Sequence, residues 1–296
     1  MSNKKIEIDV NEKSEEKWNP SSFVCALIGV ICIGIAAYGL FGVYTDYKVG
    51  SDIYNEAESE FVQIHTPEEQ PSSEVTTEEI TTEVQTEKEP EEIPDYRGPW
   101  YEMASVNVSG LKAQYPDVVG WIRFENGLIS YPVMHSDSND TYLYTAYNGT
   151  ESIGGSIFVE ATHKGDFSDT HTIIYGHNMK NGSMFGRLHN YRYNNSYFQK
   201  NKYFQIFTET EILRYEIFSY QQVHIDSFVY KENFSSGKVL GEKLLQNSLV
   251  RPSVYFEDKD KIVTLSTCIS SDDYRFVVSA VLVGRYNLKD KTLIEE

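Results

Sequence analysis

The chain has 296 residues and a formal net charge of −18, with 26 Lys and Arg against 44 Asp and Glu. Most of the excess lies in residues 51–95, which hold fifteen acidic side chains and a single lysine, Lys88. Residues 96–296 are almost balanced, with twenty basic and twenty-three acidic side chains. This pattern excludes a nucleic-acid partner, because phosphate binding needs a basic face. The balanced part, about 200 residues, is long enough to bury a sizeable core.

One segment near the N-terminus has the composition of a membrane span. Residues 23–44 read FVCALIGVICIGIAAYGLFGVY, and no charged side chain occurs between Lys17 and Asp46. At about 1.5 Å per residue, this run covers the roughly 30 Å hydrocarbon core of a bilayer. A cleaved signal peptide is the alternative, but its apolar run is usually about 7–15 residues, and no clear Ala-x-Ala site follows. We therefore expect a cytoplasmic tail at 1–20 and a transmembrane helix at 21–45.

The lysines around this segment predict its orientation. Four of them precede it, at positions 4, 5, 13 and 17, whereas only Lys48 follows it closely. The positive-inside rule then places the N-terminus in the cytoplasm and the rest of the chain outside. The sequence predicts a single-pass protein of the cell membrane, with its globular part on the extracellular face.

Residues 46–95 have the composition of a disordered stalk. The stretch SSEVTTEEITTEVQTEKEPEEIP is rich in Glu, Thr and Pro and has few large apolar residues. Such a segment cannot bury enough surface to offset the entropy lost on ordering. We expect this acidic stalk to join the membrane helix to a globular extracytoplasmic domain at 96–296.

The globular region is predicted to be mainly β. Eight apolar runs rich in β-branched and aromatic residues are bounded by turn residues, at 119–124, 129–134, 155–159, 171–175, 203–207, 213–223, 261–267 and 275–286. No β-α-β alternation is visible, which favours a mainly antiparallel barrel. Residues 100–117 suggest one or two short helices. Residues 238–249 have apolar residues at helical spacing, which predicts a helix inserted before the seventh strand.

The cysteines point to one reactive thiol. Cys25 and Cys32 lie in the membrane segment, and Cys268 is the only cysteine outside it. An unpaired cysteine in an exported domain suggests a free reactive thiol or pairing between molecules; an inert buried cysteine remains an alternative. Cys268 follows a strand-like run and precedes the polar residues 270–273. A side chain at such a strand end is held rigidly and is exposed, as a nucleophile requires.

Two side chains could assist this thiol. Only the thiolate attacks, so a cysteine nucleophile usually has a histidine nearby. His177 closes a strand-like run just after Gly176, and a glycine lets the backbone approach closely or adopt a positive φ. Arg275 opens the strand after Cys268, and its fixed charge and fork of donors suit a developing oxyanion. A hydrogen-bonded surface histidine and a solvated strand-edge arginine are equally compatible with spacing alone.

Several motifs then carry a family resemblance. Residues 264–268 read TLSTC and are followed by Arg275, and residues 172–188 read TIIYGHNMKNGSMFGRL. Further stretches are PDVVGWIRF (116–124), SYPVM (130–134), NDTYL (139–143) and GGSIF (154–158). In this order, over residues 100–286, they resemble the class B sortases, which are cysteine transpeptidases of Gram-positive bacteria.

The resemblance implies a fold and a reaction. The fold would be an eight-stranded sortase-type β-barrel with N-terminal helices and an inserted helix before the cysteine strand. Cys268 would be the nucleophile, His177 the acid/base and Arg275 the group that stabilises the reacting carbonyl. The substrates would be secreted proteins with a C-terminal sorting motif. The acceptor would be a cross-bridge amine of the peptidoglycan precursor or a pilin lysine, and no cofactor is implied.

Further positions match the substrate groove of that family. They are Asn139, Leu143 and Ser266, although each could equally be a turn, core or strand residue. A papain-like or wall-peptide hydrolase is disfavoured, because those enzymes place the cysteine before the histidine and here the order is reversed. A non-catalytic, membrane-tethered binding domain with an inert Cys268 stays open. The histidines lack metal-ligand spacing, so no metal site is predicted.

Overall fold

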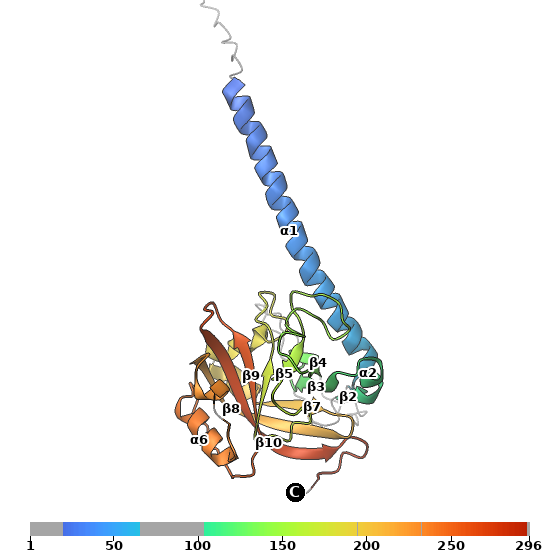
Figure 1. Ribbon diagram of the computed structural model, residues 1–296, viewed down its shortest axis with the longest axis vertical. Helices are drawn as coiled ribbons and strands as arrows, with labels where there is room; N and C mark the ends of the chain where they lie inside the picture. The colour runs from blue at the N-terminus through green and yellow to red at the C-terminus, as the bar shows by residue number, and fades with distance from the viewer. Residues whose placement is uncertain (1–19, 66–103, 194, 232, 295–296) are drawn as a thin grey trace, which may run out of the picture. The chain divides into compact units, whose positions relative to one another are not determined.

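The computed structural model describes residues 20–65, 104–193, 195–231 and 233–294 (Figure 1). The chain divides into two compact units, Met1–Asp46 and Tyr47–Glu296. The division falls within helix α1, Pro20–Phe61. Among the described residues, α1 is the helix that is long and apolar enough to cross a membrane, by length and composition. The predicted cytoplasmic tail, 1–20, lies outside the described residues apart from its last position.

The structure corrects the start of the predicted stalk. Residues 47–61 are helical, and Val62–Ile64 (β1) pairs with Ala104–Val106 (β2). Tyr54, Ala57 and Phe61 are buried in the main core of the second unit. They recur every three or four residues and so share one helix face, while acidic side chains occupy the positions between them. The stalk prediction is therefore wrong for 47–64, and residues 66–103 lie outside the described part of the chain.

Eight strands close into a barrel in the second unit. They are β3 Val118–Phe124, β4 Ser130–Met134, β5 Ile157–Val159, β6 His171–Tyr175, β7 Tyr203–Phe207, β8 Glu211–His224, β9 Ile262–Cys268 and β10 Tyr274–Asn287. Their spatial order is β10-β8-β7-β3-β4-β5-β6-β9, with β9 pairing back to β10. Pairs β4–β5 and β6–β9 are parallel, and the other six are antiparallel. Each predicted strand is confirmed, and closure leaves the barrel no free edge.

Buried aromatic side chains pack against the strands of the barrel. Trp121 is fully buried, and its indole Nε1 donates to Ser130 Oγ at 3.0 Å. The ring of Phe204 stacks on Phe124 on one side and on Tyr215 on the other, with centroids 5.1 and 5.2 Å apart. These rings come from neighbouring strands, β3, β7 and β8. Buried aromatic side chains on neighbouring strands therefore supply much of the apolar burial that stabilises the fold.

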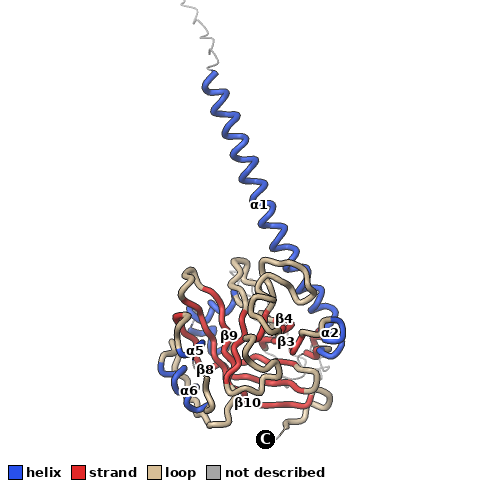
Figure 2. The backbone as a smooth tube through the Cα atoms, in the orientation of Figure 1, coloured by secondary structure: helices blue, strands red, loops and turns tan. Residues whose placement is uncertain are grey.

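The helices cover the barrel at several places. One is α2, Val108–Gln114, within the region where short helices were expected. Short elements follow β6: η2 Gly186–His189, α3 Asn190–Tyr193 and α4 Asn195–Lys200. Between β8 and β9 lie α5 Phe228–Lys231 and α6 Gly237–Gln246, which Figure 2 shows beside those strands. The helix predicted before the cysteine strand is thus confirmed as α6, with Ser236 capping its first turn.

Strand pairing gathers the predicted catalytic residues at one rim. Cys268, the last residue of β9, is the register partner of Arg275 near the start of β10. On the other side of β9, Tyr175 at the end of β6 is the partner of Ser266. Because β6 and β9 are parallel, their carboxyl ends point to the same side of the barrel. Residues just after Tyr175 therefore lie beside Cys268.

Candidate active site

The thiol of Cys268 lies at a rigid strand end. The preceding residues of β9 are buried, whereas Cys268 itself is half-buried and its thiol is free. Its carbonyl oxygen accepts a hydrogen bond from His189 Nε2 at 3.1 Å. Register pairing on one side and this contact on the other fix the backbone that carries the sulfur. The position matches the sequence-based prediction of a held but accessible side chain.

His177 follows β6 across a tightly packed glycine. Gly176 N donates to Ser266 O at 3.2 Å, and Thr267 Oγ1 donates to Gly176 O at 2.8 Å. A Cβ on Gly176 would come within 2.7 Å of the ring of Phe185. Of the two roles considered for this glycine, close backbone approach is the one observed. This packing ties the residue before His177 directly to β9.

The His177 ring is held by the loop that follows β4. Its Nε2 lies 2.7 Å from the carbonyl oxygen of Leu143. A carbonyl only accepts, so Nε2 carries the proton in this contact and Nδ1 takes no part in it. The ring of Tyr144 packs against the imidazole, with centroids 5.5 Å apart. Two consecutive residues of one loop therefore set the tautomer and the orientation of the ring.

Arg275 is fixed at the rim by its own loop. Its Nη1 donates to Asp272 O at 2.8 Å and to Tyr274 O at 3.0 Å. Both carbonyls accept from the same guanidinium nitrogen. They hold the charged group of Arg275 near Cys268, the residue with which Arg275 pairs across the two strands. The short loop of residues 269–273 left the geometry of this arginine open in the sequence. The direct pairing of Cys268 with Arg275 resolves it.

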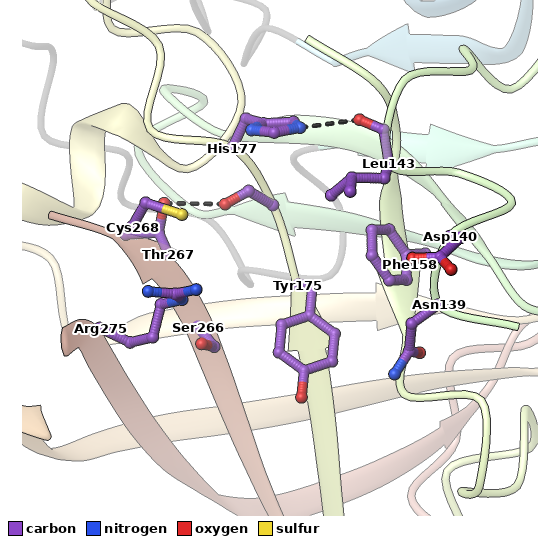
Figure 3. Close-up of a pocket in the computed structure, with 11 residues that line it drawn as sticks. Asn139, Asp140, Leu143, Phe158, Tyr175, His177, Ser266, Thr267, Cys268 and Arg275 are labelled. Atoms are coloured by element: carbon purple, nitrogen blue, oxygen red, sulfur yellow. Dashed lines mark hydrogen bonds between the residues drawn. The ribbon is translucent and has the colours of Figure 1, made fainter. Parts of the chain in front are cut away.

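All six predicted site residues line one pocket. Its walls are Asn139, Asp140, Leu143, Phe158, Tyr175, Gly176, His177, Ser266, Thr267, Cys268 and Arg275. In the view of Figure 3, the side chain of Cys268 lies between those of His177 and Arg275, and Asn139 and Leu143 lie on the facing loop. The pocket thus combines a thiol, an imidazole and a guanidinium with an apolar wall.

The far wall of the pocket is braced by a carboxylate that sequence reasoning missed. Glu160 Oε1 accepts from Asn139 Nδ2, and Oε2 accepts from the hydroxyl of Tyr175, both at 2.8 Å. Ala161 N donates to Asn139 Oδ1 at 2.8 Å, so protein contacts engage both ends of that amide. Burial, together with Glu160, holds the pKa of Tyr175 far above its usual range. The phenol therefore stays a donor that fixes this wall.

Ser266 is also held from behind. It is buried, and its Oγ lies 2.8 Å from the hydroxyl of Tyr230 on α5. Burial raises the pKa of Tyr230 to about 12, partly offset by Ser266 and Arg275. The hydroxyl pair links the short helix α5 to the strand that carries Cys268.

His189 is a second histidine near Cys268, and no sequence signal singled it out. Its ring donates to Cys268 O and stacks on Phe276, with centroids 5.1 Å apart. Burial lowers the pKa of His189, so the ring is neutral at physiological pH. It reaches the site through η2, a short element that the apolar pattern did not predict.

Comparisons with known proteins agree with this arrangement. A family model described as "Sortase domain" matches residues 124–283. Sortase B of Listeria monocytogenes is 32% identical over 198 residues, covering 62% of this chain and 80% of the relative. Sortase B of Staphylococcus aureus is 28% identical over 173 residues, covering 56% and 70%. The crystal structure of Clostridium perfringens sortase B is 31% identical, with a TM-score of 0.55, and covers 59% of this chain and 98% of that one.

With this fold, this pocket and these relatives, the chain belongs to the sortase family and is a class B sortase. It is therefore a transpeptidase enzyme. Sortases act in general on proteins that carry a sorting motif and on amine nucleophiles, at the cell surface.

Proposed function

We propose that this sortase cleaves a C-terminal sorting motif of secreted proteins with Cys268 and transfers the resulting acyl group to an amine. The observation that carries the proposal is the single pocket lined by Cys268, His177 and Arg275. A thiol, an imidazole and a guanidinium in one pocket are what acyl transfer through a thioester needs.

The first half-reaction forms the acyl-enzyme. The thiolate of Cys268 attacks a backbone carbonyl of the motif, typically that of a threonine in this family, and a C–S bond forms. The carbonyl electrons move onto oxygen, and their return breaks the C–N bond. The proton released when the Cys268 thiol becomes a thiolate resides on His177 Nδ1 and passes from there to the departing amine, because Nε2 is committed to Leu143 O. The product is a thioester on Cys268.

The second half-reaction reverses the roles. An incoming amine attacks the thioester, His177 takes its proton, and the C–S bond breaks to restore the thiolate. The acceptor would be a cross-bridge amine of the wall precursor or a pilin lysine. A cross-bridge amine as acceptor would give wall anchoring, and a pilin lysine would give polymerisation.

Arg275 would bind the oxyanion in both steps. One guanidinium nitrogen is tied to two carbonyls, which leaves the other N–H groups of the fork to face the pocket. A fixed cation needs no reorganisation when negative charge develops on the carbonyl oxygen. Asn139, Leu143 and Ser266 would contact the motif, with Leu143 supplying apolar surface.

We further propose that the apolar part of α1 anchors the enzyme in the cell membrane, with its N-terminus in the cytoplasm and the barrel on the extracellular face. The support is the charge-free run at 23–44 and the excess of lysines before it. Such an anchor would hold the pocket where secreted proteins and wall precursors meet.

A transfer assay tests this proposal. The full chain in detergent micelles is incubated with a library of sorting-motif peptides and an amine acceptor, and the products are followed by mass spectrometry. We expect one motif to be cleaved and joined to the amine, and the Cys268→Ala variant to do neither. If no peptide is cleaved and Cys268 is inert toward an alkylating probe, the non-catalytic binding domain is the better account.

A further inference from the structure

The carbonyl of Leu143 that fixes His177 is itself backed by a glycine. Gly155 has a φ of +51°, and a Cβ at this position would collide with the carbonyl oxygens of Leu143 and Tyr142. The next residue closes the contact, because Ser156 N donates to Tyr142 O at 2.9 Å. The backbone around Gly155 is therefore the surface against which the Leu143 carbonyl rests.

Gly155 is in turn held by a residue from the far end of α1. The hydroxyl of Tyr54 donates to Gly155 O and lies 3.3 Å from Ser156 Oγ. The Tyr54 ring is buried and packs edge-on against Tyr131, with centroids 5.2 Å apart. Tyr54 lies in the same compact unit as the barrel. A buried phenol with a single long-range backbone acceptor fixes that acceptor well.

These contacts form one continuous chain from α1 to the imidazole. We propose that Tyr54 and Gly155 are positioning residues that place the Leu143 carbonyl and so hold His177 in the tautomer with its proton on Nε2. The role rests on the acid/base function proposed for His177. It explains why a glycine stands at 155, within the GGSIF stretch, and why α1 continues past the membrane segment into the barrel unit.

A pair of glycine variants tests the second link. Gly155→Ala introduces both a strained positive φ and the collision with the Leu143 carbonyl. Gly149→Ala is the matched control in the same loop, because Gly149 has a φ of +83° but nothing within 4 Å of an added Cβ. We expect kcat for peptide cleavage by the full chain in micelles to fall about 10- to 100-fold in Gly155→Ala, since small misplacements are costly. Gly149→Ala should keep the wild-type rate.

A milder pair tests the first link in case Gly155→Ala fails to fold. Tyr54→Phe removes only the hydroxyl that holds Gly155 and should lower kcat about two- to tenfold. Tyr147→Phe is its control, because this ring is buried in the same aromatic cluster, 5.8 Å from Tyr54. Thermal unfolding and alkylation of Cys268 check that both variants are folded and that the thiol is accessible.

The tautomer of His177 gives a readout that requires no turnover. Nitrogen NMR of ring-labelled histidine, with His177 assigned from the His177→Gln spectrum, should show a single protonated Nε2 in the neutral wild-type ring. Tyr54→Phe and Gly155→Ala should show a mixture of tautomers. Variants that match their controls in kcat, or that lose kcat with an unchanged His177 spectrum, would overturn the inference. An active His177→Ala enzyme would instead contradict the proposed acid/base role of His177. The NMR result on its tautomer would be unaffected.

Discussion

In the proposed mechanism, the role of Arg275 depends on the shape of its guanidinium group as well as on its charge. Its guanidinium is tied to two carbonyls of the loop that turns from β9 into β10. A lysine has no fork, and its point charge cannot keep those bonds and reach the pocket at once.

We therefore expect Arg275→Lys to lose about 100-fold or more in kcat/KM, close to the loss in Arg275→Ala. Peptide cleavage kinetics measure this loss, and alkylation of Cys268 shows that the thiol stays accessible. Arg251→Lys is a suitable control, because Arg251 is exposed and, among the described residues, makes one long hydrogen bond, to Gln246 O at 3.4 Å. A lysine variant that turns over like the wild type would contradict the role of the fork.

The candidate catalytic residues could be identified from the sequence, because their chemistry and the family motifs depend on side-chain types. The contacts that hold them could not. Leu143 was predicted as a groove residue, yet its carbonyl, which any residue possesses, is what contacts His177. Glu160 and His189 act through partners that are distant in sequence, at 139 and 268. No local pattern encodes such pairs.

Among the elements, β6 and β9 share a buried polar pair, His171 and Thr264. His171 Nε2 lies 2.9 Å from Thr264 Oγ1, and burial lowers the pKa of His171 to about 3. The unfolded chain would bind this proton near pH 6.5. Between those two values the unfolded state holds more protons than the folded state, so stability falls as the pH falls.

His171→Gln removes this proton while keeping a hydrogen-bonding group near Thr264. We expect urea unfolding of the wild type to lose more stability between pH 7 and pH 5 than the variant does, by about 2 kcal/mol. The neighbouring His163, whose ring centroid lies 6.0 Å from that of His171, is present in both the wild type and the variant. The comparison therefore isolates the change at His171. Equal pH dependence of wild type and variant would show that His171 is not the responsible group.

The strands were predictable because each is an apolar run between turn residues. Their pairing was only partly so, since the two parallel pairs, β4–β5 and β6–β9, depend on long connections that carry no periodic signal. The helices at 186–200 were missed because each is too short to show an apolar stripe.

At the scale of the whole molecule, composition misplaced the start of the globular unit. Acidic residues of 47–61 suggested a stalk, but the apolar residues among them share one buried helix face. Removing residues 1–46 should therefore leave the stability of the barrel unit unchanged. Removing 1–61 takes away Tyr54, Ala57 and Phe61 from the core and should cost roughly 1.5–3 kcal/mol for each large side chain.

Urea unfolding of the two truncated proteins measures this difference. The shorter protein should also cleave the peptide at least about two- to tenfold more slowly, because it lacks the hydroxyl that holds Gly155. Equal midpoints for the two truncations would mean that 47–61 contributes nothing to the folded unit.

In the proposed mechanism, Cys268 forms the thioester. The full chain is mixed with the intact sorting-motif peptide that it cleaves. The reaction is quenched in acid within the first turnover, and the protein is digested and mapped by mass spectrometry. We expect the peptide that contains Cys268 to carry the acyl part of the substrate. An added amine should remove this mass as the transfer product appears. Transfer without an adduct on Cys268, or transfer by Cys268→Ala, would contradict this mechanism.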